Sequence, residues 1–255
     1  MEDFEKNIRT TNNTQRKTME IKEDTVHLYE DKIGRCDYIQ SYGDDLMVVN
    51  SARVSFGVTK KELDERDKKL INYLVEHKHT STLEHCGITF RCVVPLYVRS
   101  QHHRHRTWSY NEISRRYTSF DLEFYEPRIF RSQDESNRQA SNDNLINPKI
   151  GNGVFGGPRA SHQVMEHHNR SVSLYKTLLD SGICREQARG ILPQNLYTMY
   201  YASANLSNIF KFITLRSHDG AQWEIQRLAQ AMLMFCEREF PVATEAYMKE
   251  VNANS

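Results

Sequence analysis

Apolar residues recur along this chain at two spacings, and each spacing predicts a different kind of element. Over residues 63–77, and again after Asn205, they return every three or four positions, which is the period of one helix face. Over residues 88–94 they alternate with other residues, as in a half-buried strand. The whole pattern predicts helices over 46–54, 63–77, 163–179, 185–192, 206–216 and 224–240, and strands over 25–30, 34–42, 88–94, 118–125 and 197–203. The stretch 224–240 is expected to be the last long helix.

The order of these elements predicts the fold class. A further helix is expected to start at Pro95 and to carry residues 101–106. Helices and strands do not alternate as regular βαβ units, so we expect an α+β fold with a small, mostly antiparallel sheet and several long helices. No break in composition divides residues 25–255, which are expected to form one domain.

Two segments stand apart from this pattern. Residues 1–24 are polar and predict a disordered extension. Residues 131–161 are rich in Ser, Asn and Gly and poor in large apolar side chains, so a mobile lid or insertion is expected there.

Composition narrows the class of ligand. The chain has 34 lysines and arginines against 33 aspartates and glutamates, a formal net charge of +1. Overall charge therefore gives no support to general binding of polyanions, and any basic site must be local. This balance favours a small anionic ligand.

The cysteines and the hydropathy of the chain limit the cellular compartments in which we expect the protein. The five cysteines are odd in number and form no CxxC pair, which argues against a disulfide framework or a structural zinc site. No run of roughly twenty apolar residues is present to span a bilayer. We therefore expect a cytoplasmic protein that binds neither a membrane nor a metal.

The segment 104–117, RHRTWSYNEISRRY, concentrates the chemistry of the chain. Arginine side chains match phosphate oxygens, and the serine, asparagine and glutamate side chains between them supply directional hydrogen bonds for a nucleotide. The spacing R-H-R-x-x-S-x-N-x-x-S-x-R-Y is satisfied at all eight of its fixed positions. This pattern resembles the signature of the flavin-dependent thymidylate synthases (ThyX family).

Other blocks extend the resemblance from residue 52 to the last predicted helix. They are ARVSF at 52–56, H-x-x-x-x-E-H at 79–85, REQAR at 185–189, LPQNLYT at 192–198, and residues 215–226 with the sequence AQWEIQ at their end. The resemblance implies the ThyX-like fold and reductive methylation of dUMP to dTMP. In that reaction methylene-tetrahydrofolate donates the carbon, FAD is the cofactor and NADPH restores the flavin. It also implies a homotetramer in which several subunits build each active site.

The resemblance implies roles for particular residues. The dUMP contacts would be Gln101, Glu112, Ser114, Arg115, Arg116, Arg189 and Arg216. The FAD contacts would be Ser55, Ser81, Glu84, Arg104, His105, Arg106, Thr107, Glu112, Asn205 and Lys211. Arg216, Ser114 and the folate-side His79 would act in catalysis, with Arg216 stabilising negative charge on the uracil oxygens. Ser207 stands where many relatives have arginine, and Lys211 is a candidate to restore that charge.

Three alternatives would use other features of the same sequence. A nucleic-acid-binding module would use the arginines and aromatic rings of residues 99–117, but the near-neutral charge balance disfavours it. Zinc at His102, His103 and His105 is disfavoured by the interleaved arginines and by the lack of an acidic partner motif. A thymidylate synthase with a cysteine nucleophile is disfavoured because no proline precedes a cysteine and no cysteine has activating neighbours.

Overall fold

The computed structural model describes residues 19–114, 116, 122–138, 140–151 and 156–253. Its strands are β1 (Thr25–His27), β2 (Arg35–Tyr42), β3 (Gly87–Pro95), β4 (Ser109–Glu112), β5 (Phe130–Gln133), β6 (Ser141–Ile146) and β7 (Tyr197–Asn205). Its α-helices are α2 (Asp45–Arg53), α3 (Glu65–Glu76), α4 (Leu96–His102), α5 (Ala160–Asp180), α6 (Arg185–Ala188), α7 (Leu206–Arg216), α8 (Trp223–Glu239) and α9 (Pro241–Ala253). Short 3-10 helices are η1 (Val54–Phe56), η2 (Thr80–His85) and η3 (Arg189–Ile191).

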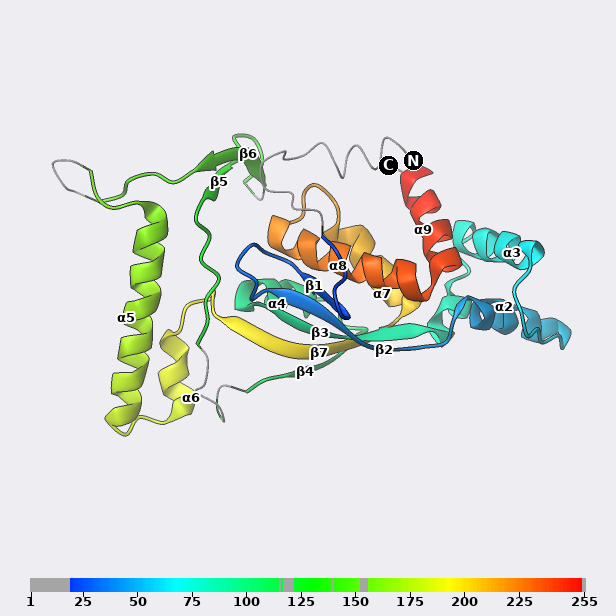
Figure 1. The fold of residues 1–255 in the computed structure, drawn as a ribbon, viewed down its shortest axis with the longest axis horizontal. Helices are drawn as coiled ribbons and strands as arrows, with labels where there is room; N and C mark the ends of the chain where they lie inside the picture. Colours follow the sequence, from blue (N-terminus) through cyan, green and yellow to red (C-terminus); the bar gives the residue numbers. More distant parts are fainter. Residues whose placement is uncertain (1–18, 115, 117–121, 139, 152–155, 254–255) are drawn as a thin grey trace.

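A five-stranded antiparallel sheet in the order β1-β2-β3-β7-β4 forms the centre of the molecule (Figure 1). The register places Cys92 of β3 opposite Cys36 of β2 on one side and Tyr200 of β7 on the other. Strands β5 and β6 form a separate antiparallel hairpin. The predicted α+β class with a small, mostly antiparallel sheet is confirmed.

The main core lies between this sheet and the helices α4, α7 and α8 on one of its faces (Figure 1). Phe90 and Cys92 of β3 are fully buried there, as their alternation with other residues predicts. Helix α7 contributes the buried residues Leu206, Ile209 and Phe210 from one face, and the Asn205 side chain caps its first turn by accepting from the Asn208 amide.

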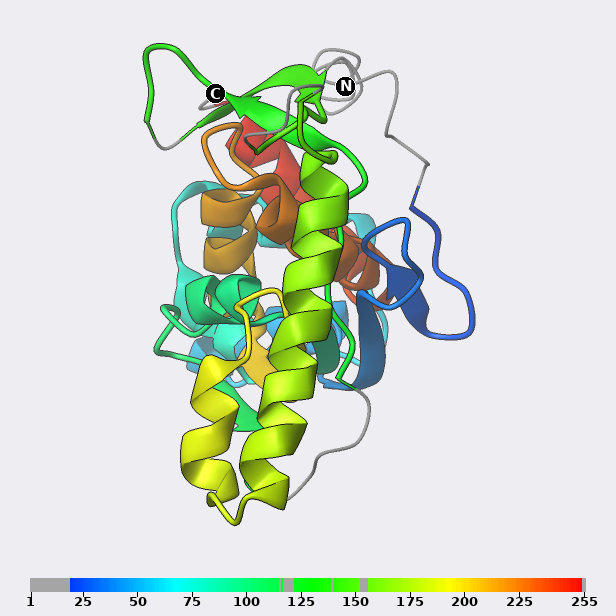
Figure 2. The same ribbon diagram turned by 90° about the vertical axis from the view of Figure 1, so that its left-hand side faces the viewer.

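Helices α5 and α6 lie to one side of the sheet and pack against each other (Figures 1 and 2). A second, smaller apolar cluster holds them, with Tyr175 of α5 and Ala188 of α6 buried in it. Leu196, just before β7, belongs to the same cluster and joins this arm to the sheet.

The prediction that residues 224–240 form the last long helix is corrected by the 13-residue helix α9, which follows it. Pro241 occupies the first turn of α9, where its missing N–H has no intrahelical partner to lose. The buried Asp45 carboxylate of α2 accepts the backbone amides of Val242 and Ala243, each at 2.9 Å. A side chain from the other end of the chain therefore caps this helix.

Three further segments differ in detail from the prediction, and the segment expected to be a lid or insertion contains elements that the pattern did not predict. Helix α4 ends at His102 and does not reach residue 106. The helix expected over 185–192 divides into α6 and η3. The strand expected over 118–125 lies partly outside the described residues, and in its described part Phe124 forms an isolated bridge with Leu196. Residues 131–161 contain β6, all of β5 except Phe130, and the start of α5.

The N-terminal segment predicted as an extension falls in two parts. Residues 1–18 lie outside the described residues. In residues 19–24, Met19 and Ile21 pack against the main core.

Candidate active site at the end of α4

The segment 104–117 begins in a tight turn after α4 and continues as the edge strand β4, which pairs with β7. The Tyr110 hydroxyl donates to the backbone carbonyls of His102 (2.9 Å) and His105 (3.2 Å), so β4 holds the turn against α4. Arg104 and Arg106 are exposed, and no carboxylate of a described residue lies within ion-pair distance of either. The turn therefore presents two cations to solvent from a fixed backbone.

His102 lies directly behind this turn and is fully buried. Its Nδ1 is 2.9 Å from the Tyr200 hydroxyl of β7, and its ring packs edge-on to Trp108. Burial, and then the nearby His105, hold the pKa of His102 well below its usual range, so the ring is neutral. Within the described chain its Nε2 has no hydrogen-bond partner.

The end of α7 meets the turn through Arg216. The Arg216 Nε–H donates to Nε2 of His105 at 3.2 Å, and its Nη2 donates to the carbonyl of Gln101 at 3.3 Å. Burial, and then the charge of Arg216, lower the pKa of His105 to about 4, so the imidazole is neutral and accepts this hydrogen bond. No described carboxylate pairs with Arg216, and burial lowers its pKa. This arrangement leaves a positive charge that no described protein anion neutralises.

Glu112 ends β4 and is held by two neighbours. Its Oε1 accepts from the Thr198 hydroxyl of β7 at 2.6 Å and lies 3.3 Å from Nε of Arg99 in α4. The β4–β7 register places Glu112 opposite Tyr200, two residues from Thr198, and α4 supplies Arg99.

The residues after β4 lead toward α6. The Ser114 hydroxyl accepts from the Arg116 amide at 3.3 Å, and Arg116 Nη2 lies 3.8 Å from Oε2 of Glu186 in α6. Arg189 follows Glu186 by three residues and is exposed at the start of η3. The structure therefore brings the arginines of two separate motifs to the same helical turn. Arg115, also predicted at the site, lies outside the described residues.

Several residues of the predicted FAD set lie near the start of α7. Ser81 and Glu84 are exposed on η2, which packs against α7. Asn205 caps α7, and Lys211 is exposed on the same helix. Ser207 is buried, and its hydroxyl has no partner among the described residues.

Ser55 and His79 lie beside α2 and α3, at the end of the molecule to which η2 also belongs and away from α6. Ser55 is exposed on η1, between Val54 and Phe56, which are also exposed. His79 is exposed after α3, and its ring centroid is 6.1 Å from that of Tyr73. Figure 1 shows α2 and α3 at one end of the long axis and α6 at the opposite end. A single chain therefore does not bring Ser55 and His79 to Arg189.

Three functional candidates were missed in the sequence. Gln222 lies 2.5 Å from Gln101, Glu224 lies 2.9 Å from Gln222, and Arg131 of β5 lies 2.9 Å from Glu224. The block AQWEIQ marks the first two residues, but the contact of either with α4 or β5 arises only from tertiary packing. Arg131 carries no sequence signal for this role, because it lies in a segment of low apolar content.

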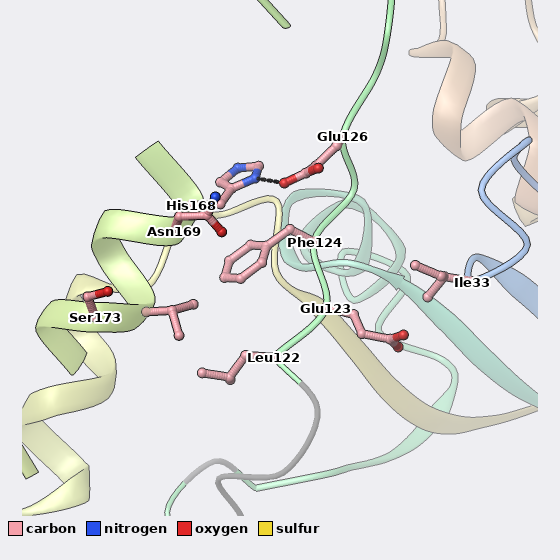
Figure 3. Close-up of a pocket in the computed structure, with 9 residues that line it drawn as sticks. Ile33, Leu122, Glu123, Phe124, Glu126, His168, Asn169 and Ser173 are labelled. Carbon is pink, nitrogen blue, oxygen red and sulfur yellow. Dashed lines mark hydrogen bonds and ion pairs between the residues drawn. The ribbon is translucent and has the colours of Figure 1, made fainter. Parts of the chain in front are cut away.

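A pocket of about 450 Å³ lies away from these residues, between α5 and the strand-like segment 122–126 (Figure 3). The buried His168 of α5 is 2.8 Å from Glu126 and stacks on Phe124, with ring centroids 4.5 Å apart. His168 thus packs as a structural side chain in one wall of the pocket.

The described part of the chain offers neither a cluster of metal ligands nor a membrane-spanning helix. No group of three or more His, Cys, Asp and Glu side chains there is arranged to hold a metal ion. None of the helices in that part is both long and apolar enough to cross a bilayer.

Comparison with known proteins shows the family of this chain. The model of the family described as "Thymidylate synthase complementing protein" matches residues 38–242. The flavin-dependent thymidylate synthase of Thermus thermophilus is 39% identical over 209 residues, which cover 82% of this chain and 73% of that protein. The enzyme of the same name from Thermotoga neapolitana is 36% identical over 216 residues, covering 85% of this chain and 91% of that one. The chain belongs to the flavin-dependent thymidylate synthase family.

A solved structure supports the fold. It is the UMP/dUMP methylase PolB from Streptomyces cacaoi bound with 5-Br dUMP, which superposes with a TM-score of 0.70 at 31% identity. The match covers 84% of this chain and 94% of that one. These relatives are enzymes and do not favour the alternative of a nucleic-acid-binding module.

Proposed function

We propose that this protein methylates dUMP to dTMP in an FAD-dependent reaction, with methylene-tetrahydrofolate as carbon donor and NADPH as reductant. The observation that carries this proposal is Arg216, a partly buried guanidinium held by His105 and the Gln101 carbonyl with no described carboxylate beside it. A fixed positive charge of this kind stabilises negative charge as it develops on a bound uracil ring. Family membership and the dUMP-analogue complex of a relative support the same substrate.

The residues of this chain fit a flavin dinucleotide. Arg104 and Arg106 present cations without a described carboxylate partner, Lys211 adds a third exposed cation, and the buried Ser207 hydroxyl has no partner in the described chain. We assign Ser55, Ser81, Glu84, Arg104, His105, Arg106, Thr107, Glu112, Asn205 and Lys211 to holding FAD. When bound and reduced by NADPH, the flavin would supply the hydride that completes the methyl group.

The phosphate of dUMP is assigned to the α6 side of the site. A nucleoside monophosphate carries close to two negative charges, and charge-assisted hydrogen bonds to it contribute on the order of 1.5–3 kcal/mol each. The ion pair of Arg116 with Glu186 places Arg116 within a helical turn of Arg189. We assign Arg115, Arg116, Arg189 and Ser114 to the phosphate side of dUMP, and Gln101, Glu112 and Arg216 to the rest of the nucleotide.

We further propose that the active site is shared between subunits of a homotetramer. The separation of Ser55 and His79 from Arg189 along the long axis supports this, because residues assigned to one reaction must meet around one substrate (Figure 1). His79 would then face the folate, with Tyr73 and His77 extending its ring surface. A cytoplasmic location agrees with the five free thiols of the chain.

The test is direct assay of the purified, FAD-reconstituted protein. With dUMP, methylene-tetrahydrofolate and NADPH we expect dTMP by chromatography, and we expect no dTMP when FAD is omitted after its removal. Formation of dTMP without flavin would contradict the proposal.

A further inference from the structure

A continuous line of hydrogen-bonded side chains runs from the β5–β6 hairpin to Gln101. Arg131 Nη2 of β5 lies 2.9 Å from both carboxylate oxygens of Glu224, and Oε2 of Glu224 accepts from Nε2 of Gln222 at 2.9 Å. Oε1 of Gln222 in turn accepts from Nε2 of Gln101 at 2.5 Å. The line therefore joins β5, the start of α8 and the end of α4.

The chemistry of Glu224 gives this line a fixed direction. A guanidinium has only donors, so both oxygens of Glu224 act as acceptors. The amide of Gln222 must then turn its NH₂ group toward Glu224 and its oxygen toward Gln101. The amide of Gln101 must in turn direct an N–H at Gln222. Without these partners, each side-chain amide could flip and exchange the positions of its oxygen and its NH₂ group. The line of hydrogen bonds fixes both amides in one of the two orientations.

The surroundings hold the carboxylate in place. Glu224 is buried at 5% exposure, in the first turn of α8, where the helix dipole favours a negative charge. The Tyr29 hydroxyl donates to its backbone carbonyl at 3.1 Å, and Arg131 lies over the ring of Trp223 at 5.4 Å. Gln222 is the N-cap residue of α8, so its backbone is fixed as well.

We propose that Glu224 and Gln222 are positioning residues for dUMP binding, which set the orientation of the Gln101 amide at the nucleotide site. The inference rests on the proposed function, because it takes Gln101 as a dUMP contact. In this orientation the Gln101 oxygen and one amide hydrogen remain at fixed places for the ligand. Neither Gln222 nor Glu224 touches the nucleotide, and both act through Gln101.

A polarity-reversing variant tests the line without removing bulk. In Glu224→Gln the new amide can turn its oxygen toward Arg131 and its NH₂ toward Gln222. Gln222 then has to present its own NH₂ to Gln101, and the Gln101 amide has to reverse. We expect dUMP to bind FAD-reconstituted E224Q about tenfold more weakly by calorimetry, as loss of one to two hydrogen bonds implies. The matched control is Glu237→Gln, the same change at an exposed position of α8, which we expect to bind like the wild type.

The decisive variant is the double substitution Q222E/E224Q. Here the amide introduced at position 224 donates to the carboxylate introduced at position 222, and that carboxylate accepts from Gln101. The original orientation of Gln101 returns with the net charge conserved. We expect dUMP affinity within about threefold of the wild type, well above that of E224Q alone. A merely structural role would make the double variant at least as weak as the single one.

The outcomes separate the two proposals. If the wild-type protein does not bind dUMP, both the proposed function and this inference are refuted. The positioning role alone would be refuted if E224Q bound dUMP as tightly as the wild type. It would also be refuted if the double variant bound dUMP no better than E224Q while the two variants had the same thermal midpoint.

Discussion

Arg216 and His105, which are 111 residues apart in the chain, share a hydrogen bond of 3.2 Å between Nε of the guanidinium and Nε2 of the imidazole. The bond requires a neutral histidine, since a protonated ring has no lone pair to accept with. It ties the end of α7 to the segment 104–117 and leaves the guanidinium charge available to a ligand.

The first prediction concerns this charge. Arg216→Met keeps much of the aliphatic stem but removes the guanidinium, and we expect dTMP formation to fall by about 10²–10³-fold, as for loss of an oxyanion-stabilising donor. The control Arg66→Met removes an exposed arginine of α3 and should leave the rate unchanged. The initial rate of dTMP formation is the measurement. A variant that stays folded and retains more than half of the rate would refute the role of Arg216.

The second prediction concerns acid stability. The pKa of His105 is about 4 in the folded chain and about 6.5 in the unfolded one, so between these values the unfolded state binds more protons. The free energy of unfolding should therefore fall as the pH drops from about 6.5 to about 4. In His105→Gln, which cannot take up that proton, the fall should be smaller. Urea unfolding at about pH 7.5 and about pH 4.5 measures it, with the exposed His27→Gln as control. An equal fall in wild type and H105Q would show that His105 does not contribute.

The third prediction concerns the phosphate. Arg116→Ala and Arg189→Ala should each weaken the binding of dUMP by about tenfold or more and the binding of deoxyuridine much less. Only dUMP carries the phosphate charges that these arginines contact. Arg170→Ala is a matched control, since Arg170 is an exposed arginine 3.8 Å from Glu166, as Arg116 is 3.8 Å from Glu186. Binding constants from calorimetry decide the matter. An equal loss of affinity for dUMP and deoxyuridine would show that the two arginines do not bind the phosphate.

The fourth prediction concerns the cysteines. Cys36, Cys86 and Cys236 are buried, and burial raises the pKa of each thiol, that of Cys86 to about 12. Cys184 is exposed and is the one cysteine that solvent reaches. We expect Cys184→Ser to form dTMP at close to the wild-type rate, since no thiolate attack on the uracil is required. Abolished turnover in a folded C184S protein would point to a cysteine nucleophile.

The fifth prediction concerns assembly. If Ser55 and Arg189 meet across a subunit boundary, then a variant inactivated by a change at Arg189 and a variant inactivated on the α2–α3 side should regain partial activity when they are mixed after dissociation and reassembly. The recovered rate is compared with that of each variant reassembled alone. No recovery at any mixing ratio would indicate sites built within one chain.

Most of the helices were predictable because their apolar spacing is local. Asn205 caps α7 directly before its helical repeat begins, whereas Asp64, the capping-box residue of α3, lies inside the helix predicted over 63–77. Helix α9 was missed because Pro241 ends the predicted helix 224–240, although a proline also suits the first turn of a new helix.

The edge strand β4 was missed for a different reason. Its four residues, SYNE, are mostly exposed and polar, and only pairing with the distant strand β7 makes them a strand. The sequence likewise groups the predicted site residues into motifs. Which motifs lie next to each other in space is decided by the pairing of strands in the sheet. The line through Gln222 and Glu224 depends on packing of α8 beside α4, which no local pattern encodes.

The cap of α9 by Asp45 also bears on how the chain is made. The Asp45 carboxylate is buried and bonded to the amides of Val242 and Ala243, nearly two hundred residues downstream. A nascent chain on the ribosome holds this carboxylate without its partners until α9 itself is being added. The α2–α3 end, with Ser55 beside it, therefore cannot reach its final form during synthesis. A truncation that stops at Phe240 would keep the whole central sheet but leave the Asp45 carboxylate of α2 without its two amide partners.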